Sequence, residues 1–176
     1  MINHECGIRP GAIAVVLSVI VAQGAFAQKI TTEFDEGGAF NTFKTFVVRD
    51  GQVNSPSPVL NSELTKKRIV TEIERALTGR GLTKATGTAD VNVSFTFGSM
   101  RRMETETFPA GWRGRGTRVA QVPRTEGTLV IDLRDATTSS LVLRVIASED
   151  EPNPAKLSDK IDDMVKKAIA KYPPRK

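Results

Sequence analysis

Residues 129–145 read LVIDLRDATTSSLVLRV, and this stretch gives the clearest structural signal in the chain. Apolar residues occupy alternate positions on both sides of a short polar segment, a pattern typical of strands with one buried face. Two such strands around a short turn predict an antiparallel β-hairpin. If Leu133 lies opposite Leu143, Asp132 lies opposite Arg144 on the other face of the sheet. We expect a structural ion pair there, contributing about 0.2–1 kcal/mol.

The rest of the fold is predicted from similar periodicities outside this hairpin. An aromatic-rich segment predicts a strand over residues 40–48 that ends at a turn over residues 49–51. Alternating apolar residues predict another strand over residues 91–97. Apolar residues at helical spacing predict one helix over residues 64–77 and a second helix over residues 157–172.

Capping residues support both helices. Asn61 or Ser62 can cap the first helix, and Gly79 or Gly81 can end it in the left-handed conformation. The Asn-Pro pair at residues 153–154 is typical of a helix start. Together the elements predict an α+β fold, a two-layer sandwich in which a mainly antiparallel sheet of about four to five strands carries both amphipathic helices on one face. The other face carries Thr, Ser and charged side chains, so we expect it to be solvated or to serve as an interaction surface.

The N-terminal segment, residues 1–27, is predicted to be a cleaved signal peptide. Residues 11–22, GAIAVVLSVIVA, form an apolar run of signal-peptide length that is too short to span a bilayer comfortably. The sequence AFA that ends at Ala27 suits signal peptidase, so we expect cleavage at about Ala27/Gln28. An uncleaved N-terminal anchor is the alternative. Because Cys6 precedes the apolar run, we do not expect a lipoprotein.

Cleavage would remove the only histidine, His4, together with the only cysteine. The remaining residues 28–176 suit a single domain that is stabilised by packing without disulfides. Without His or Cys, this domain cannot build a Ser-His-Asp triad, a thiol nucleophile, or an imidazole or thiolate zinc site. Carboxylate, lysine, tyrosine or serine chemistry remains open, as does no chemistry at all. The leading prediction has no catalytic residues, no metal site and no cofactor. The net charge of +5 favours anionic partners.

Positive charge is concentrated in residues 100–124, MRRMETETFPAGWRGRGTRVAQVPR, which we predict to be a basic loop rich in Gly and Arg. The segment holds six arginines, two glutamates and the only tryptophan. Guanidinium groups bind phosphate and carboxylate, and an indole adds an apolar anchor. The candidate ligand-binding residues are Arg101, Arg102, Trp112, Arg113, Arg115 and Arg118. The alternative is a solvated, flexible hairpin extension whose arginines keep the protein soluble.

These features predict a non-catalytic exported envelope protein, periplasmic or secreted, that binds its partner through the loop. The expected partner is an anionic envelope component, including lipid head groups at a membrane surface, or an envelope protein, and not a nucleic acid. The oligomeric state is left open. The alternative is a carboxylate-dependent hydrolase acting on an envelope polymer, with Glu126, Asp132 and Asp135 as candidate carboxylates. The acidic run at residues 149–151 is predicted to be a solvated loop.

Several segments, taken together, resemble a known family. They are FKTF at 43–46, IERALTGRGL at 73–82, ADV at 89–91, EGTLVIDL at 126–133 and IAKYPP at 169–174. In this order they resemble a bacterial envelope family called domain of unknown function four-one-three-six, over about residues 32–174. The resemblance implies a small exported protein and supplies no catalytic residues. The chain departs from the family pattern in lacking a lipid-accepting cysteine, at Leu143, where Trp is frequent, and at Val145, where Gly is frequent.

Overall fold

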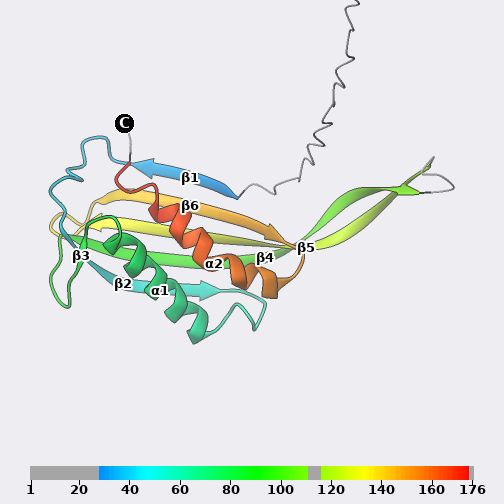
Figure 1. The fold of residues 1–176 in the computed structure, drawn as a ribbon, viewed down its shortest axis with the longest axis horizontal. Coiled ribbons are helices and arrows are strands. Elements are labelled where there is room, and N and C mark those ends of the chain that lie inside the picture. The colour runs from blue at the N-terminus through cyan, green and yellow to red at the C-terminus, as the bar shows by residue number, and fades with distance from the viewer. Residues whose placement is uncertain (1–27, 111–115, 175–176) are drawn as a thin grey trace, which may run out of the picture.

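The computed structural model describes residues 28–110 and 116–174, so the predicted signal peptide lies outside the described residues. Within them the chain forms six strands and two helices (Figure 1). In chain order these are β1 (Lys29–Phe34), β2 (Thr45–Asn54), α1 (Glu63–Thr78), β3 (Thr83–Lys84), β4 (Val91–Ala110), β5 (Gly116–Asp135), β6 (Leu141–Glu151) and α2 (Pro154–Ile169). Among the described residues, neither helix is long and apolar enough to cross a bilayer.

The described strands form one mixed sheet in the order β1-β6-β5-β4-β2-β3. β2 runs parallel to both of its neighbours, β3 and β4, and the remaining pairs are antiparallel. The sheet also curls into a half-barrel. The predicted sandwich with a mainly antiparallel sheet of four to five strands is therefore wrong. Two short strands, β1 and β3, were not predicted. In addition, the connection through α1 brings the chain back so that the next strands run parallel to β2.

The first part of the sheet differs from the prediction in its boundaries. Residues 49–51, predicted to be a turn, lie inside β2, which continues to Asn54. The pairing shifts there, because Val48 lies opposite Val93 whereas Asp50 lies opposite Ser94. The Arg-Asp-Gly sequence at residues 49–51 therefore corresponds to an irregularity within β2, where the strand accommodates one extra residue, and not to a turn.

The β5–β6 hairpin has the predicted register. Leu133 lies opposite Leu143, and Asp132 lies opposite Arg144. The Arg144 guanidinium donates from Nε and Nη2 to the two carboxylate oxygens of Asp132, at 2.7 and 2.6 Å. The predicted cross-strand ion pair is therefore confirmed, in a bidentate geometry that fixes both side chains.

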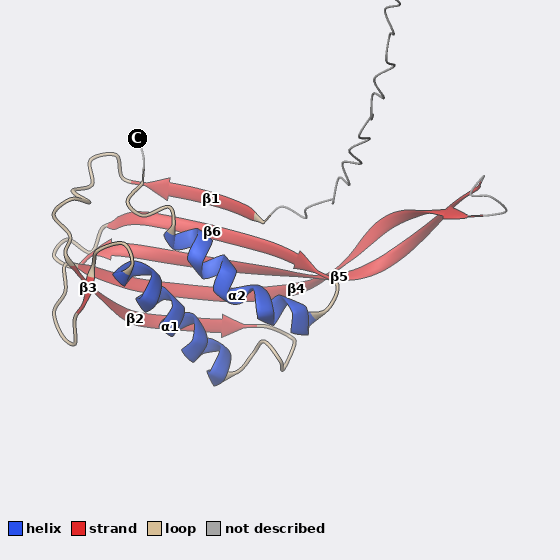
Figure 2. Ribbon diagram, in the orientation of Figure 1, coloured by secondary structure: helices blue, strands red, loops and turns tan. Residues whose placement is uncertain are grey.

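Both helices lie over the same face of the sheet (Figure 2). The Ser62 hydroxyl caps α1 by accepting a hydrogen bond from the Thr65 backbone N–H at 3.1 Å. The Asn153 side chain caps α2 by accepting from the Ala155 N–H at 2.9 Å. After α1, Gly81 takes a positive φ of 91°, which glycine adopts without strain.

The core lies between the two helices and the sheet. α1 contributes Ile69, Ile73 and Leu77, α2 contributes Leu157, Ile161, Met164 and Val165, and the facing strands contribute Phe46, Val93, Phe95, Phe97, Leu129 and Ile131. Arg68 of α1 donates to both carboxylate oxygens of Asp162 on α2, at 2.6 and 2.8 Å. Gly127 of β5 allows α2 to approach closely, because a Cβ there would lie 2.8 Å from a Leu157 methyl carbon.

Candidate functional site

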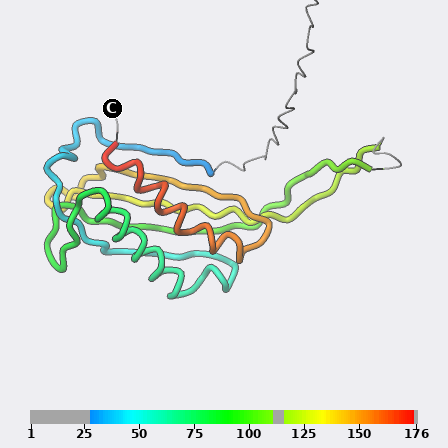
Figure 3. Tube along the Cα trace, in the orientation of Figure 1, coloured from blue at the N-terminus to red at the C-terminus, as the bar shows by residue number. Residues whose placement is uncertain are grey.

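The most distinctive surface feature is a two-stranded extension of β4 and β5. β2 pairs with β4 as far as Gly98, and β6 pairs with β5 as far as Thr125. Beyond these residues β4 and β5 pair with each other alone among the described strands, up to Ala110 opposite Gly116. Figure 3 shows this ribbon projecting from the sheet. We call residues 99–110 and 116–124 the arm.

The arm replaces the loop predicted over residues 100–124. On both sides of residues 111–115, which lie outside the described residues, the chain forms paired strands. The loop prediction is therefore wrong for the described residues of this segment. Polar or charged residues occur on both faces of the arm, and Pro109 and Pro123 lie within it, so the sequence lacks the apolar alternation that indicates a strand.

Of the candidate ligand-binding residues, the structure describes Arg101, Arg102 and Arg118, and it does not bring these three together. Trp112, Arg113 and Arg115 lie outside the described residues. Arg101 lies exposed at the base of the arm, opposite Thr125, and Arg118 lies exposed seven residues further along β5, about 23 Å away at strand spacing. Arg102 points to the opposite face of β4 from Arg101, as neighbours in a strand do.

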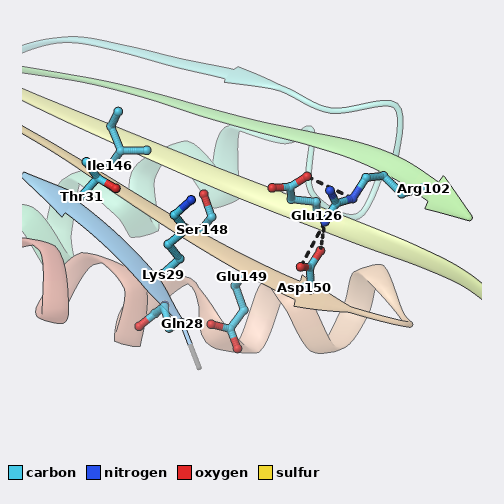
Figure 4. A pocket seen from close by; sticks show the side chains of 9 residues that line it. All are labelled: Gln28, Lys29, Thr31, Arg102, Glu126, Ile146, Ser148, Glu149 and Asp150. Carbon is cyan, nitrogen blue, oxygen red and sulfur yellow. Dashed lines mark hydrogen bonds and ion pairs between the residues drawn. The ribbon is translucent and has the colours of Figure 1, made fainter. Parts of the chain in front are cut away.

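Arg102 is held by two carboxylates at the base of the arm. Its Nε lies 3.2 Å from Glu126 Oε2, and its Nη2 lies 3.1 Å from Asp150 Oδ1. Glu126 and Asp150 are opposite each other on β5 and β6, and Figure 4 shows the guanidinium between them. The hydrogen bond to Asp150, helped by the charge of Glu126, raises the pKa of Arg102. Its charge is therefore balanced within the chain.

Arg124 is the second arginine at this base, directly opposite Arg102. Its Nε lies 2.8 Å from Glu104 Oε2, and its Nη2 donates to Glu106 Oε1. The hydrogen bond to Glu106 raises the pKa of Arg124. These two arginines and the four carboxylates that hold them have a net charge of −2, so the base of the arm is not a basic surface. Sequence reasoning missed these pairs because the partners come from three strands.

A pocket of about 360 Å³ opens beside this base (Figure 4). β1 begins at Lys29 opposite Ser148, whereas β6 continues to Glu151, which leaves a notch at the edge of the sheet. The notch is lined by Gln28, Lys29, Thr31, Arg102, Glu126, Ile146, Ser148, Glu149 and Asp150.

Glu149 is the buried carboxylate of this pocket, with a side chain that is only 8% exposed. Its Oε1 lies 3.9 Å from Lys160 Nζ on α2. Burial raises the pKa of Glu149, and the charge of Lys160 opposes that rise. The prediction that residues 149–151 form a solvated loop is wrong, because they end β6 and Glu149 faces the protein interior.

The three carboxylates considered for hydrolysis do not converge. Glu126 pairs with Arg102, Asp132 pairs with Arg144, and Asp135 accepts two backbone hydrogen bonds in the turn after β5, at 2.7 and 2.9 Å. Glu126 and Asp132 are six residues apart on one strand, which corresponds to about 20 Å. Glu126 does face Asp150, but the guanidinium of Arg102 occupies the space between them. The described residues also contain no group of three His, Cys, Asp or Glu side chains placed to hold a metal ion.

Comparison with known proteins gives a family and a fold. The family described as domain of unknown function DUF4136 matches residues 30–174. No curated protein matches the chain. A DUF4136 family protein from Bacteroides thetaiotaomicron is similar in structure, with a TM-score of 0.51 and 15% identity over 83% of this chain and 96% of that one.

Two further solved structures share the fold. A PDZ domain protein from Parabacteroides distasonis matches 84% of this chain with a TM-score of 0.57 and 17% identity, and the chain spans only 36% of that protein. A PelC dodecamer from Paraburkholderia phytofirmans matches 85% of this chain and 100% of its own, with a TM-score of 0.50 and 12% identity. At these identities the likeness concerns the fold alone.

Proposed function

The chain belongs to the DUF4136 family, a domain of unknown function, and from this premise we propose that it is a non-catalytic exported envelope protein that binds a protein partner through the arm. The observation that carries the proposal is the extension of β4 and β5 beyond every neighbouring strand described. A ribbon of two strands is at best marginally stable in water without something packed against it. The arm therefore suits a surface that is completed by a partner.

The side chains of the arm support contact with a protein. Met103 and Val119 point to one face and are 58% and 62% exposed. Phe108 and Arg118 lie opposite each other on the other face, and both are exposed. Apolar side chains grouped on a projecting element favour a protein interface, and an exposed guanidinium favours an acidic group beside it.

Within the described residues, the same geometry favours a protein over a purely anionic ligand. Tight binding of a phosphate or a glycan carboxylate would need several free cations close together. In the described part of the arm, Arg102 and Arg124 are engaged by carboxylates, and Arg101 and Arg118 lie far apart. A second copy of this chain is one partner of the required kind, and the shared fold of the PelC dodecamer makes it the first to test.

Export remains part of the proposal. It rests on the apolar run of residues 11–22 and on the peptidase site that ends at Ala27. Cell fractionation combined with N-terminal sequencing of the purified protein tests it. A periplasmic or secreted chain that begins at Gln28 is expected, and an uncleaved chain in the cytosolic fraction would contradict this part of the proposal.

The partner is tested by crosslinking in the cell. A photo-reactive residue replaces Val119 on the arm, and in a control it replaces Leu64, which is 80% exposed on α1. We expect a crosslinked product from position 119 and a much weaker one from position 64. Adding R118E should reduce the product from position 119 at least about tenfold.

The outcomes of this experiment are separable. A product of twice the monomer mass that contains only this chain would identify a second copy as the partner. A heterologous protein, identified by mass spectrometry, would support the proposal equally. Equal crosslinking from positions 64 and 119, or capture of lipid or glycan alone, would overturn it.

A further inference from the structure

A second cleft, of about 580 Å³, lies at the opposite end of the fold from the arm. Its walls come from the end of β1, from Arg80 just after α1, and from the segment that follows α2. Figure 1 shows the C-terminal end of the described chain beside the end of β1. The topology thus brings three segments that are distant in sequence to one site.

Among the described residues that line this cleft, the two ionisable side chains, Arg80 and Lys171, are both cations. Arg80 donates from Nη2 to the backbone oxygen of Ala170 at 3.0 Å, which holds its guanidinium at the end of α2. Lys171 is exposed and has no ion-pair partner among the described residues. No Asp or Glu is among the described residues that line the cleft. The site therefore favours an anionic group.

The remaining walls are largely apolar. Phe34 packs against the core while also lining the cleft, and Pro173 and Pro174 line it from the C-terminal segment. Thr32 adds one hydroxyl group beside Phe34 on the same face of β1. An aromatic ring and two prolines next to two cations match a ligand with an apolar body and an anionic end.

We propose that this cleft binds a single-chain amphiphile with one carboxylate head group, of the fatty-acid class. The carboxylate lies against Lys171 and Arg80, and the alkyl chain lies against Phe34 and the two prolines. A cleft of this volume falls in the range of small-molecule sites, about 300–1,000 Å³. The site is separate from the arm, so it does not depend on the function proposed above.

The test measures the binding of a series of ligands to the full chain by isothermal titration calorimetry. Each ligand is used below its critical micelle concentration. Dodecanoate is expected to bind, and decanoate about tenfold more weakly, because two buried methylenes are lost. Dodecyltrimethylammonium, which has the same chain and the opposite charge, should bind at least tenfold more weakly than dodecanoate. Equal binding of these two dodecyl compounds would overturn the proposal, as would binding of acetate with the same affinity as dodecanoate.

Two variants locate the site. K171E should weaken dodecanoate binding at least tenfold, whereas K156E, the same charge change at the other end of α2, should leave it unchanged. Both lysines are exposed, so neither variant should alter the fold, and circular dichroism melting curves check this. Equal weakening by the two variants, or none by K171E, would place the ligand elsewhere and overturn the assignment.

Discussion

Arg102 of β4 lies directly opposite Arg124 of β5, at the point where the arm leaves the sheet. Like charges that face each other across two strands repel and destabilise the pairing. Here each arginine is held by its own pair of carboxylates, which are Glu126 and Asp150 for Arg102 and Glu104 and Glu106 for Arg124. The arrangement links three strands at the base of the arm.

Replacing Arg124 with alanine should loosen the arm without unfolding the core. The change removes the cation between Glu104 and Glu106 and leaves their like charges on the same face of β4. We expect amide hydrogen exchange within residues 103–110 and 116–123 to become at least about tenfold faster, with little change in β6 or α2. R118A on the same strand is the control, since Arg118 is exposed and should leave exchange unchanged. Unaltered exchange in R124A would show that these ion pairs do not hold the arm.

The Asp132–Arg144 pair should make a small contribution to stability. The Arg144 side chain is 35% exposed, so solvent weakens the interaction despite its bidentate geometry. D132N should lower the free energy of unfolding by about 0.2–1 kcal/mol, measured by urea denaturation. A double-mutant cycle with R144Q isolates the coupling between the two residues. A coupling energy near zero would mean that the pair is not structural.

The parts of the fold that depend on local pattern were predictable from the sequence. The helices follow from apolar spacing and from caps such as Ser62, and the Asp132–Arg144 register follows from one short turn. The parallel pairing of β2 with β4 was not predictable, because it depends on how α1 crosses the sheet. β1 was not predicted because its sequence, KITTEF, has only Ile30 and Phe34 as large apolar residues.

The candidate site was predictable to a smaller extent. The basic composition of residues 100–124 singled out the segment that forms the arm, but composition does not tell which arginines are free. Arg102 is engaged by Asp150, 48 residues later in the chain, and only the position of β6 beside β5 brings them together. Sequence reasoning therefore overestimated the unpaired positive charge, since it counted Arg102 as available.

Glu149 should make stability depend on pH in the direction opposite to that of a salt-bridged carboxylate. Burial raises its folded-state pKa above the ordinary value of 4.5, so the ionised form costs folding free energy. This cost is missing below pH 4.5, grows as the pH rises through the folded-state pKa, and is complete above it. E149Q should therefore melt at a higher temperature than the wild type at pH 8 and lose this advantage at pH 3.5.

The control for this experiment is E151Q, two residues further along the same strand. Glu151 is less buried, so E151Q should raise the melting temperature at pH 8 less than E149Q does. Thermal melts of the three proteins between pH 3.5 and 8 make the comparison. A lower melting temperature of E149Q at pH 8 would mean that the ion pair with Lys160 outweighs the cost of burial.

Adding a single methyl group at Gly127, by substitution with alanine, should damage the packing of α2 on the sheet. An alanine Cβ would lie 2.8 and 2.9 Å from the two methyl carbons of Leu157, whereas one at Gly87 would meet nothing within 4 Å. We expect G127A to lower the free energy of unfolding by about 1–3 kcal/mol and G87A to change it little, both measured by urea denaturation.

Combining G127A with L157A tests the cause of this loss. L157A alone removes a fully buried side chain and should cost about 2–5 kcal/mol. If the alanine methyl at 127 collides with Leu157, part of it fills the space that L157A opens, so the double variant should be more stable than the sum of the two losses predicts. Strictly additive losses would show that Gly127 is required for its backbone and not for the close approach of α2 to β5.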